Sequence, residues 1–377
     1  MSDKKQSDVK QPGWLCKVWL WVKRWWLPIA ILLITSTGLA CALSIPQQVF
    51  ETPREPANDK SAPVLLAQSN LRLAFLYITG GAIAVVGLIE TFRKNNNEKL
   101  KNDQDKEKND REHLRQVRAD RRERYTKAVE QLGDEKAPIR MGGVYTLVGL
   151  VDEWLEDESI EKYEDRLKEG QVIINSLCAY IRSPFPLTER AEQLDGEYTK
   201  DLQNDFRGDT EKFDADKRAF TRDKAALEEE RQIRQNIIKE MREHLLDAEE
   251  PGTWSAFDYN FSNAYFFYPV DFSDSHFCAS LDFTQATFTE KADFFMAAFA
   301  AEADFSKAAF IQDADFYGVK FTGDDTFSRA NFTEGTEFFK TTFTGDGTFH
   351  KAKFNGPLLF SRALFMRNST FSKAKFA

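Results

Sequence analysis

The chain has 377 residues, and its 60 acidic and 51 basic residues give a formal net charge of −9 at pH 7. It contains only four histidines and four cysteines, and Cys16, Cys41, Cys178 and Cys278 show no C-x-x-C spacing. This scatter argues against a zinc site or a disulfide framework and fits a reducing compartment. No Gly-rich loop follows a predicted strand in the way that phosphate binding requires. We therefore expect a protein that is not an enzyme, with no catalytic residue, no metal and no cofactor.

Two apolar stretches lie near the N-terminus. Residues 25–45 are uncharged and long enough to cross a bilayer, and they follow a basic segment, 1–24, that also carries a cluster of tryptophans. The second stretch, 71–92, is followed by basic residues, whereas the connecting segment 46–70 holds only two. Because basic residues stay on the cytoplasmic side, we expect two transmembrane helices in the inner (plasma) membrane, an extracytoplasmic loop and both termini in the cytoplasm.

An alternative for the first stretch is a cleaved signal peptide, with Ala40-Cys41-Ala42 as the cleavage region. The long basic segment before it and the length of the apolar run argue against this alternative. In either case, we expect the second stretch to keep the rest of the chain in the cytoplasm.

The middle of the chain predicts helices. Residues 93–123 are almost entirely charged or amide-bearing, which is typical of a solvated helix or a loose coiled coil rather than a core. Residues 124–186 predict a small helical domain, because apolar residues recur three and four apart at 144–155 and 173–181.

Residues 187–250 are again strongly charged, but Phe206, Phe213, Phe220 and Leu227 are spaced seven apart. This spacing favours a coiled coil or a helical hairpin. We expect the following helix, at 233–246, to cover the open end of the C-terminal region.

The C-terminal region, 251–377, carries phenylalanines at alternating steps of five and six residues, from Phe261 to Phe376. Eleven such pairs repeat with a period of eleven residues, which indicates stacked copies of one small unit. On an α-helix these residues would scatter around the axis, and on a flat strand an odd step would alternate between faces. The backbone must therefore turn at every repeat, which predicts a β-solenoid. We expect an interior ladder formed by Phe272, Phe277, Phe283, Phe288, Phe294, Phe299, Phe305, Phe310, Phe316, Phe321, Phe327 and Phe332.

The residues around each phenylalanine agree with a narrow solenoid. The residue two positions earlier is usually alanine, which is small enough to share the interior with a ring. An aspartate precedes every second phenylalanine over five consecutive pairs, and we expect it to bond turn amides rather than calcium. These residues are Asp271, Asp282, Asp293, Asp304 and Asp315.

The units at 292–294, 303–305 and 314–316 all read Ala-Asp-Phe, which resembles the A-(D/N)-(L/F)-x-x signature of pentapeptide-repeat proteins. That resemblance implies a right-handed quadrilateral β-helix with stacked interior Phe or Leu side chains. The sixth residue in alternate units departs from the signature, so each four-sided coil should take up two of the eleven-residue periods, whether or not the extra residue forms a bulge. Segments within 124–145 and 177–182 resemble the helical region of membrane-anchored bacterial members of the family.

Charge is distributed unevenly along the repeats. Residues 257–346 contain 15 acidic and 5 basic residues, whereas 347–377 contain six basic residues and no acidic residue. A plain explanation is that the charges protect the edges of the solenoid. The alternative is a docking tip, formed by Lys351, Lys353, Arg362, Arg367, Lys373 and Lys375. Such a tip would contact anionic lipid or an acidic partner, and the last coil could also stack into a twofold homodimer.

These features predict a membrane-anchored, non-enzymatic cytoplasmic scaffold that presents a β-solenoid to an unidentified cytoplasmic protein. The alternative follows from the resemblance, because some pentapeptide-repeat proteins mimic DNA and bind topoisomerases such as gyrase. The acidic part of the repeats is compatible with that role. We do not expect direct binding of nucleic acid.

Overall fold

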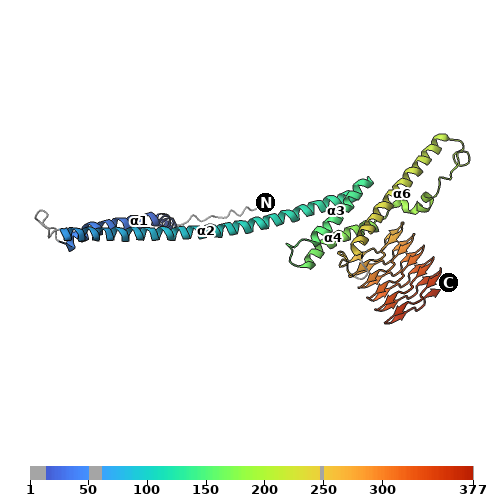
Figure 1. Ribbon diagram of the computed structural model, residues 1–377. Helices are drawn as coiled ribbons and strands as arrows, with labels where there is room; N and C mark the ends of the chain where they lie inside the picture. The colour runs from blue at the N-terminus through green and yellow to red at the C-terminus, as the bar shows by residue number, and fades with distance from the viewer. Residues whose placement is uncertain (1–13, 51–61, 247–249, 377) are drawn as a thin grey trace. The chain divides into compact units, whose positions relative to one another are not determined.

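The computed structural model describes residues 14–50, 62–246 and 250–376, and the chain divides into two compact units between residues 113 and 114. The first unit contains α1 (Trp14–Val49) and the part of α2 (Ala62–Leu132) that precedes residue 114 (Figure 1). Trp25–Val49 and the apolar part of α2 are long and apolar enough to cross a membrane, by length and composition.

Two contacts join α1 and α2 within the first unit. The side-chain amide of Gln68 donates hydrogen bonds to the carbonyls of Pro46 and Phe50, at 3.2 and 2.9 Å. Further along, Gly38 lies against the side chain of Thr79, where an added Cβ would collide. A small residue at this point therefore allows close approach of the two helices.

The segment 93–123 continues α2 without a break, and most of its side chains are exposed. Its charged residues therefore form a solvated helical surface, as expected for a segment that has no apolar stripe.

The second unit begins with the last part of α2, from residue 114, and this part shares one core with the helices that follow. They are α3 (Ala137–Leu155), α4 (Tyr163–Arg182), η1 (Pro186–Arg190), α5 (Ala191–Asp195) and α6 (Thr210–Leu245). The apolar residues spaced three and four apart are buried, including Val144, Leu147 and Val151 on α3 and Ile174 and Leu177 on α4.

The seven-residue spacing in 187–250 has an explanation other than a coiled coil. Phe213 and Phe220 lie on α6, and both pack edge-on against Tyr198, with ring centroids 5.9 and 5.3 Å apart. Phe206 packs against Phe213 at 5.6 Å. The non-helical segment 196–209 thus supplies the contacts that the coiled-coil interpretation assigned to another helix.

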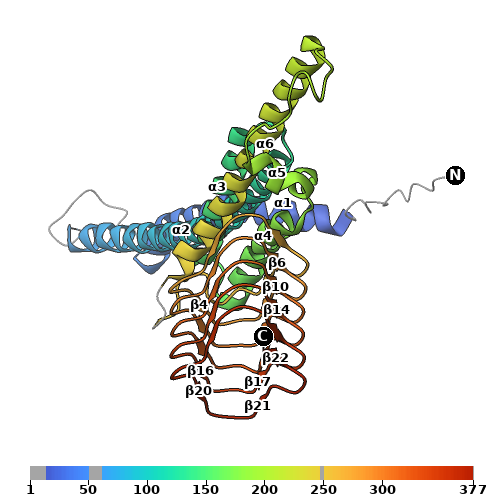
Figure 2. The same cartoon turned by 90° about the vertical axis from the view of Figure 1, so that its right-hand side faces the viewer.

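The C-terminal region is a β-solenoid of about five turns, built from strands of two residues each. The strands form four parallel sheets, and we name these faces 1 to 4 in chain order (Figure 2). Face 1 consists of β1 (Tyr259–Asn260), β5 (Leu281–Asp282), β9 (Ala303–Asp304), β13 (Asp325–Thr326), β17 (Gly347–Thr348) and β21 (Ser369–Thr370). Face 2 consists of β2 (Tyr265–Phe266), β6 (Thr287–Phe288), β10 (Ala309–Phe310), β14 (Asn331–Phe332), β18 (Lys353–Phe354) and β22 (Lys375–Phe376).

The other two sheets have five strands each. Face 3 consists of β3 (Val270–Asp271), β7 (Ala292–Asp293), β11 (Ala314–Asp315), β15 (Thr336–Glu337) and β19 (Leu358–Leu359). Face 4 consists of β4 (His276–Phe277), β8 (Ala298–Phe299), β12 (Lys320–Phe321), β16 (Thr342–Phe343) and β20 (Leu364–Phe365).

Each strand pairs with the strand four places later, two repeat periods along the chain, as in Phe288↔Phe310 and Phe310↔Phe332. This register confirms the prediction that one four-sided coil takes up two eleven-residue periods. The phenylalanine rings stack in four columns rather than in one, because each side of the coil contributes its own ring. Examples from the four columns have centroids 4.7 to 5.1 Å apart: Phe288–Phe310, Phe299–Phe321, Phe305–Phe327 and Phe294–Phe316.

Two kinds of corner alternate and account for the steps of five and six. The five-residue corners are β-turns whose third residue has a left-handed backbone, such as Lys307 (φ 60°) and Gly318 (φ 67°). The six-residue corners are bends, and at some of them an aspartate of one coil accepts a hydrogen bond from the backbone of the next coil. One example joins the Gly335 amide to Asp313 Oδ1 at 3.0 Å. The sixth residue is therefore accommodated at the bends, and the strand register stays at two repeat periods.

Helices α4 and α6 cover the first coil, and the buried core runs without interruption from the helices into the solenoid (Figure 2). Gln171 on α4 bonds both backbone polar groups of Asp258, at 2.8 and 2.9 Å. From α6, Arg231 donates to the carbonyl of Phe267 at 3.0 Å and Arg242 to that of Ser273 at 2.9 Å. The helix expected at 233–246 is thus the second half of α6, and it satisfies backbone groups that an open end would expose.

Candidate docking surfaces

The interior of the solenoid is dry and filled with rings. None of the twelve phenylalanines of the expected interior ladder, Phe272 to Phe332, is more than 1% exposed. The small residues between them, such as Ala286, Ala308 and Ala330, are also buried. Because no space is left for a ligand among these side chains, the chemistry available to partners lies on the outside.

The five repeating aspartates form the turns that the sequence predicts. In each case Oδ1 accepts a hydrogen bond from the amide two residues later, over distances of 2.7 to 3.0 Å, at Asp271, Asp282, Asp293, Asp304 and Asp315. One oxygen of each carboxylate is therefore committed to the backbone. Within the described residues, no group of three or more His, Cys, Asp or Glu side chains could hold a metal ion.

One aspartate points inward. Asp325 is only 1% exposed and occupies the position that Ala303 fills one coil earlier. Its Oδ1 accepts the Ala303 amide at 2.9 Å, while Oδ2 is buried without a hydrogen-bond partner. Burial raises the pKa of Asp325 to about 8, so this carboxyl is mostly protonated at neutral pH.

A partly exposed aromatic ladder runs along the corner between faces 3 and 4. It consists of Phe295, Tyr317 and Phe339, whose rings stack at 5.1 and 5.3 Å in three successive coils. Phe295 is 39% exposed, and the ammonium of Lys340 lies 3.0 Å from the Tyr317 hydroxyl. The equivalent residues of the coils before and after are Ser273 and Ser361. The rings are therefore a local feature of three coils rather than a requirement of the fold.

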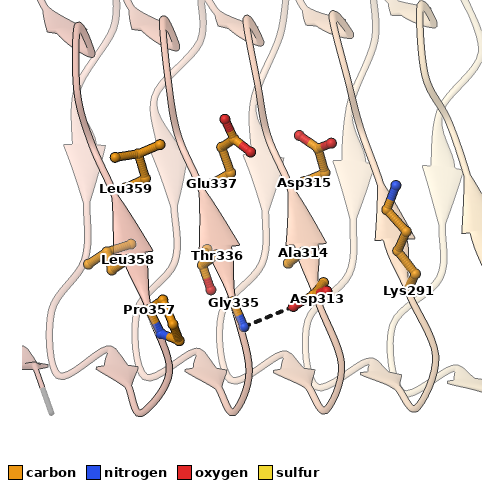
Figure 3. Close-up of a pocket in the computed structure, with 10 residues that line it drawn as sticks. All are labelled: Lys291, Asp313, Ala314, Asp315, Gly335, Thr336, Glu337, Pro357, Leu358 and Leu359. Atoms are coloured by element: carbon orange, nitrogen blue, oxygen red, sulfur yellow. Dashed lines mark hydrogen bonds between the residues drawn. The ribbon is translucent and has the colours of Figure 1, made fainter.

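An open groove lies beside the aromatic ladder on face 3 (Figure 3). Asp315, Glu337 and Leu359 point outward from neighbouring strands along it, and Lys291 lies at the opposite end from the leucine. Lys291 pairs with Asp293 at 2.7 Å. Burial is the main cause of a raised pKa at Asp315, and the neighbouring Asp293 carboxylate adds to it. The groove therefore combines partly desolvated carboxylates with an apolar end.

The six basic residues of the expected docking tip do not form one patch. Lys351 and Lys373 lie at the corner between faces 1 and 2, and Lys353 and Lys375 pair directly on face 2. Arg367 lies at the corner between faces 4 and 1. Arg362 lies at the diagonally opposite corner from Lys351, 5.6 Å above the Phe339 ring.

Two further bases, which were missed from the sequence, continue the column of Lys351 and Lys373. Lys307 and Arg329 occupy the same left-handed corner position as Lys351 and Lys373, one coil apart. The interval of two repeat periods between them was visible in the sequence, but it has meaning only once the four-sided coil is known. We call the following set the basic ridge: Lys307, Arg329, Lys351, Lys353, Lys373 and Lys375.

The junction between helices and solenoid carries a cluster of titratable side chains. His244 stacks on Trp254 with centroids 4.1 Å apart, and its Nε2 lies 3.2 Å from Asp152 Oδ2. Burial lowers the pKa of His244, but hydrogen bonds to Asp152 and to the Glu240 carbonyl outweigh it and raise the pKa. Trp254 also donates to Asp152 at 2.8 Å, so this histidine has a structural role.

Residues 283–331 match the family model described as Pentapeptide repeats (9 copies). No curated protein and no solved structure matches the chain. The matched segment lies inside the solenoid, where four-sided coils, stacked rings and aspartate turns follow the same repeat. The C-terminal region of this chain is a pentapeptide-repeat β-solenoid.

Proposed function

We propose that this protein is a membrane-anchored, non-enzymatic scaffold whose β-solenoid binds another protein in the cytoplasm. The observation that carries the proposal is the partly exposed aromatic ladder beside the groove on face 3. Stacked aromatic rings supply rigid contact area at low entropic cost, and partly desolvated carboxylates favour a partner of opposite charge. Both features occur on a surface whose backbone is held by paired strands, so a partner would meet a preformed site.

Crosslinking from the full chain in its native membranes tests this docking surface. A photo-crosslinking residue in place of Glu337, in the groove, should capture a discrete protein. The same residue in place of Thr326, on face 1, is the matched control and should not capture it. Replacing Phe295 and Phe339 with serine, as at Ser273 and Ser361, should abolish the crosslink. Equal capture from both faces, or capture that survives the serine variant, would contradict the proposal.

The membrane anchor is tested separately. Two helices of suitable length and composition support it, as do the basic residues that flank both apolar stretches. Alkaline carbonate should leave the full chain in the membrane fraction and release a chain that lacks residues 1–92. Labelling of single cysteines placed at 46–70 and in the solenoid, from one side of the membrane, tests the proposed two-pass topology.

DNA mimicry remains the second candidate, because carboxylates line face 3 at Asp271, Asp293, Asp315 and Glu337. Against it, the basic ridge on the same solenoid would repel the positively charged DNA-binding surface of a topoisomerase. Salt-sensitive binding of the chain to gyrase, with displacement by duplex DNA, would favour this candidate over the scaffold.

A further inference from the structure

The basic ridge is an exposed column of like charges. Lys307, Arg329 and Lys373 are exposed, and each successive corner position lies one coil further along the solenoid. The amides of Lys307, Arg329 and Lys351 donate to carbonyls of the next coil at 2.8, 2.8 and 2.9 Å, which holds the column in register. The coil spacing of about 4.8 Å places these cations close enough to repel one another.

No direct ion pair offsets this repulsion in the described part of the chain. The described residues contain no ion pair to any member of the basic ridge within 4.0 Å. Over the last coils, the outward positions of face 1 carry Thr326, Thr348 and Thr370. The outward positions of face 2 are Asn331, Lys353 and Lys375. A ridge of this kind is stabilised by an external polyanion.

The backbone at the ridge does not itself favour basic side chains. The corner positions have left-handed φ values of 58° to 61°, a region that glycine and asparagine occupy more readily. Asn263 holds the same position in the first coil, and Gln285 holds it in the second. The fold therefore accepts neutral residues here, and four consecutive bases are not required by the turn.

We propose that the basic ridge lies against the anionic headgroups of a membrane surface. This inference rests on the proposed membrane anchor, because an anchored chain keeps lipid phosphates at a high effective concentration near the solenoid. A straight column of cations matches a continuous field of headgroups, and each base near such a surface adds to binding. The ridge thereby fixes one corner of the solenoid and leaves the aromatic ladder, at the diagonally opposite corner, free for a protein partner.

Lysine labelling on the reconstituted full chain tests the inference. The chain is placed in vesicles of phosphatidylcholine alone or mixed with phosphatidylglycerol, and an amine-reactive reagent is applied from the side of the solenoid. In the anionic vesicles, labelling of Lys351, Lys353 and Lys375 should fall several-fold. Labelling of Lys320 and Lys340, which lie outside the ridge, should stay the same. High salt should remove the protection, because the attraction is screened.

Two variants with the same change in charge provide the control. Lys307→Gln, Arg329→Gln, Lys351→Gln and Lys373→Gln together should abolish protection of Lys353 and Lys375. Each base removed weakens the association roughly fivefold. Lys291→Gln, Lys320→Gln, Lys340→Gln and Arg362→Gln together should leave that protection intact. Gln285 shows that glutamine fits the ridge position.

The results of these experiments distinguish a failure of this inference from a failure of the proposed membrane anchor. If the chain floats with both kinds of vesicle but its ridge lysines label equally in each, the inference is overturned and the anchor stands. The same conclusion follows if both variants lose protection alike. If the chain floats with neither kind of vesicle, the anchor and the inference fail together.

Discussion

The solenoid and the helical cap, by which we mean α3, α4 and α6, share an apolar core but differ in the other contacts that they bury. In the solenoid, each buried ring meets other rings in the coils above and below, so one contact is repeated many times. In the cap, a buried ion pair joins Arg234 Nε to Glu230 Oε1 at 2.7 Å, and both side chains are nearly inaccessible to solvent. Arg234 also donates to the carbonyls of Ile181 and Ser183. Repeated apolar contacts tolerate variation, whereas a unique polar network does not.

The largest effect should come from breaking the polar network of the cap. Glu230→Ala leaves Arg234 buried without its partner carboxylate, and we expect a loss of about 3–5 kcal/mol in the free energy of unfolding. Urea denaturation of the full chain, followed by hydrogen exchange in α4 and α6, measures this. Glu230→Gln, which keeps the shape of the side chain, is the control and should lose less. A loss below about 1 kcal/mol for the alanine variant would contradict this view of the cap.

The next largest effect concerns Asp325, a carboxyl buried in the solenoid interior. The folded-state pKa of Asp325 is about 8, above its ordinary value of 3.8. The folded state therefore binds a proton that the unfolded state has released, and the stability of the wild type should fall as pH rises from about 4 to 8. Asp325→Ala removes the unpartnered Oδ2 and should gain about 1–3 kcal/mol at pH 8.

The pH profile provides the control for this variant. Denaturation at several pH values should show that Asp325→Ala removes most of the wild-type slope between pH 4 and 8. An unchanged slope would assign the pH dependence to other groups.

A smaller effect should follow from a conservative change within the rings. Phe305→Leu keeps an apolar side chain among apolar neighbours, and we expect a loss of about 1 kcal/mol. The partly exposed Phe371 has fewer neighbours, so Phe371→Leu should cost less. Denaturant midpoints of the two variants measure the difference. A loss at Phe305 as large as that of Glu230→Ala would remove the contrast between the two regions.

The smallest effect should arise at the junction of the two regions. The folded-state pKa of His244 is raised, so the stability from its contact with Asp152 is fully present below the unfolded pKa of about 6.5. It is lost as pH rises through the folded pKa. His244→Gln should therefore cost up to about 1 kcal/mol at pH 6 and less at pH 9. Equal costs at both pH values would show that the charge of His244 does not contribute.

The same contrast explains what could be predicted from the sequence. The interior rings and the aspartate turns followed from the spacing of the residues, because every coil obeys the same rule, whereas the coil of two repeat periods also needed the four sides that the resemblance to pentapeptide-repeat proteins implies. The buried pair of Glu230 and Arg234 could not be predicted, since its members read as two more charges on a charged helix. The spacing of seven between Phe206, Phe213 and Phe220 favoured a coiled coil or a helical hairpin but did not identify the contact partner, and Phe206 lies outside α6.

The residues of the outer surfaces could be predicted only in part. Lys351 and Lys373 were singled out by local charge, but Lys307 and Arg329 lie among acidic residues in the sequence and were missed. Only the folding of the chain into four sides brings these bases into one column. The aromatic ladder was missed for the same reason, because Phe295, Tyr317 and Phe339 adjoin the regular interior phenylalanines along the chain.

Because one coil takes up two repeat periods, the solenoid keeps its columns of side chains only when it gains or loses whole coils. Loss or duplication of two whole periods removes or adds one complete layer and leaves every column in its place. A change of a single period also preserves the alternation of the two corners, yet it rotates all later layers by half a turn. Lys351 and Lys373 would then continue the corner column of Lys340 rather than that of Arg329. Insertion or deletion of one period in the gene would thus place the residues of one corner below those of the opposite corner. The interior would still consist of stacked phenylalanine rings.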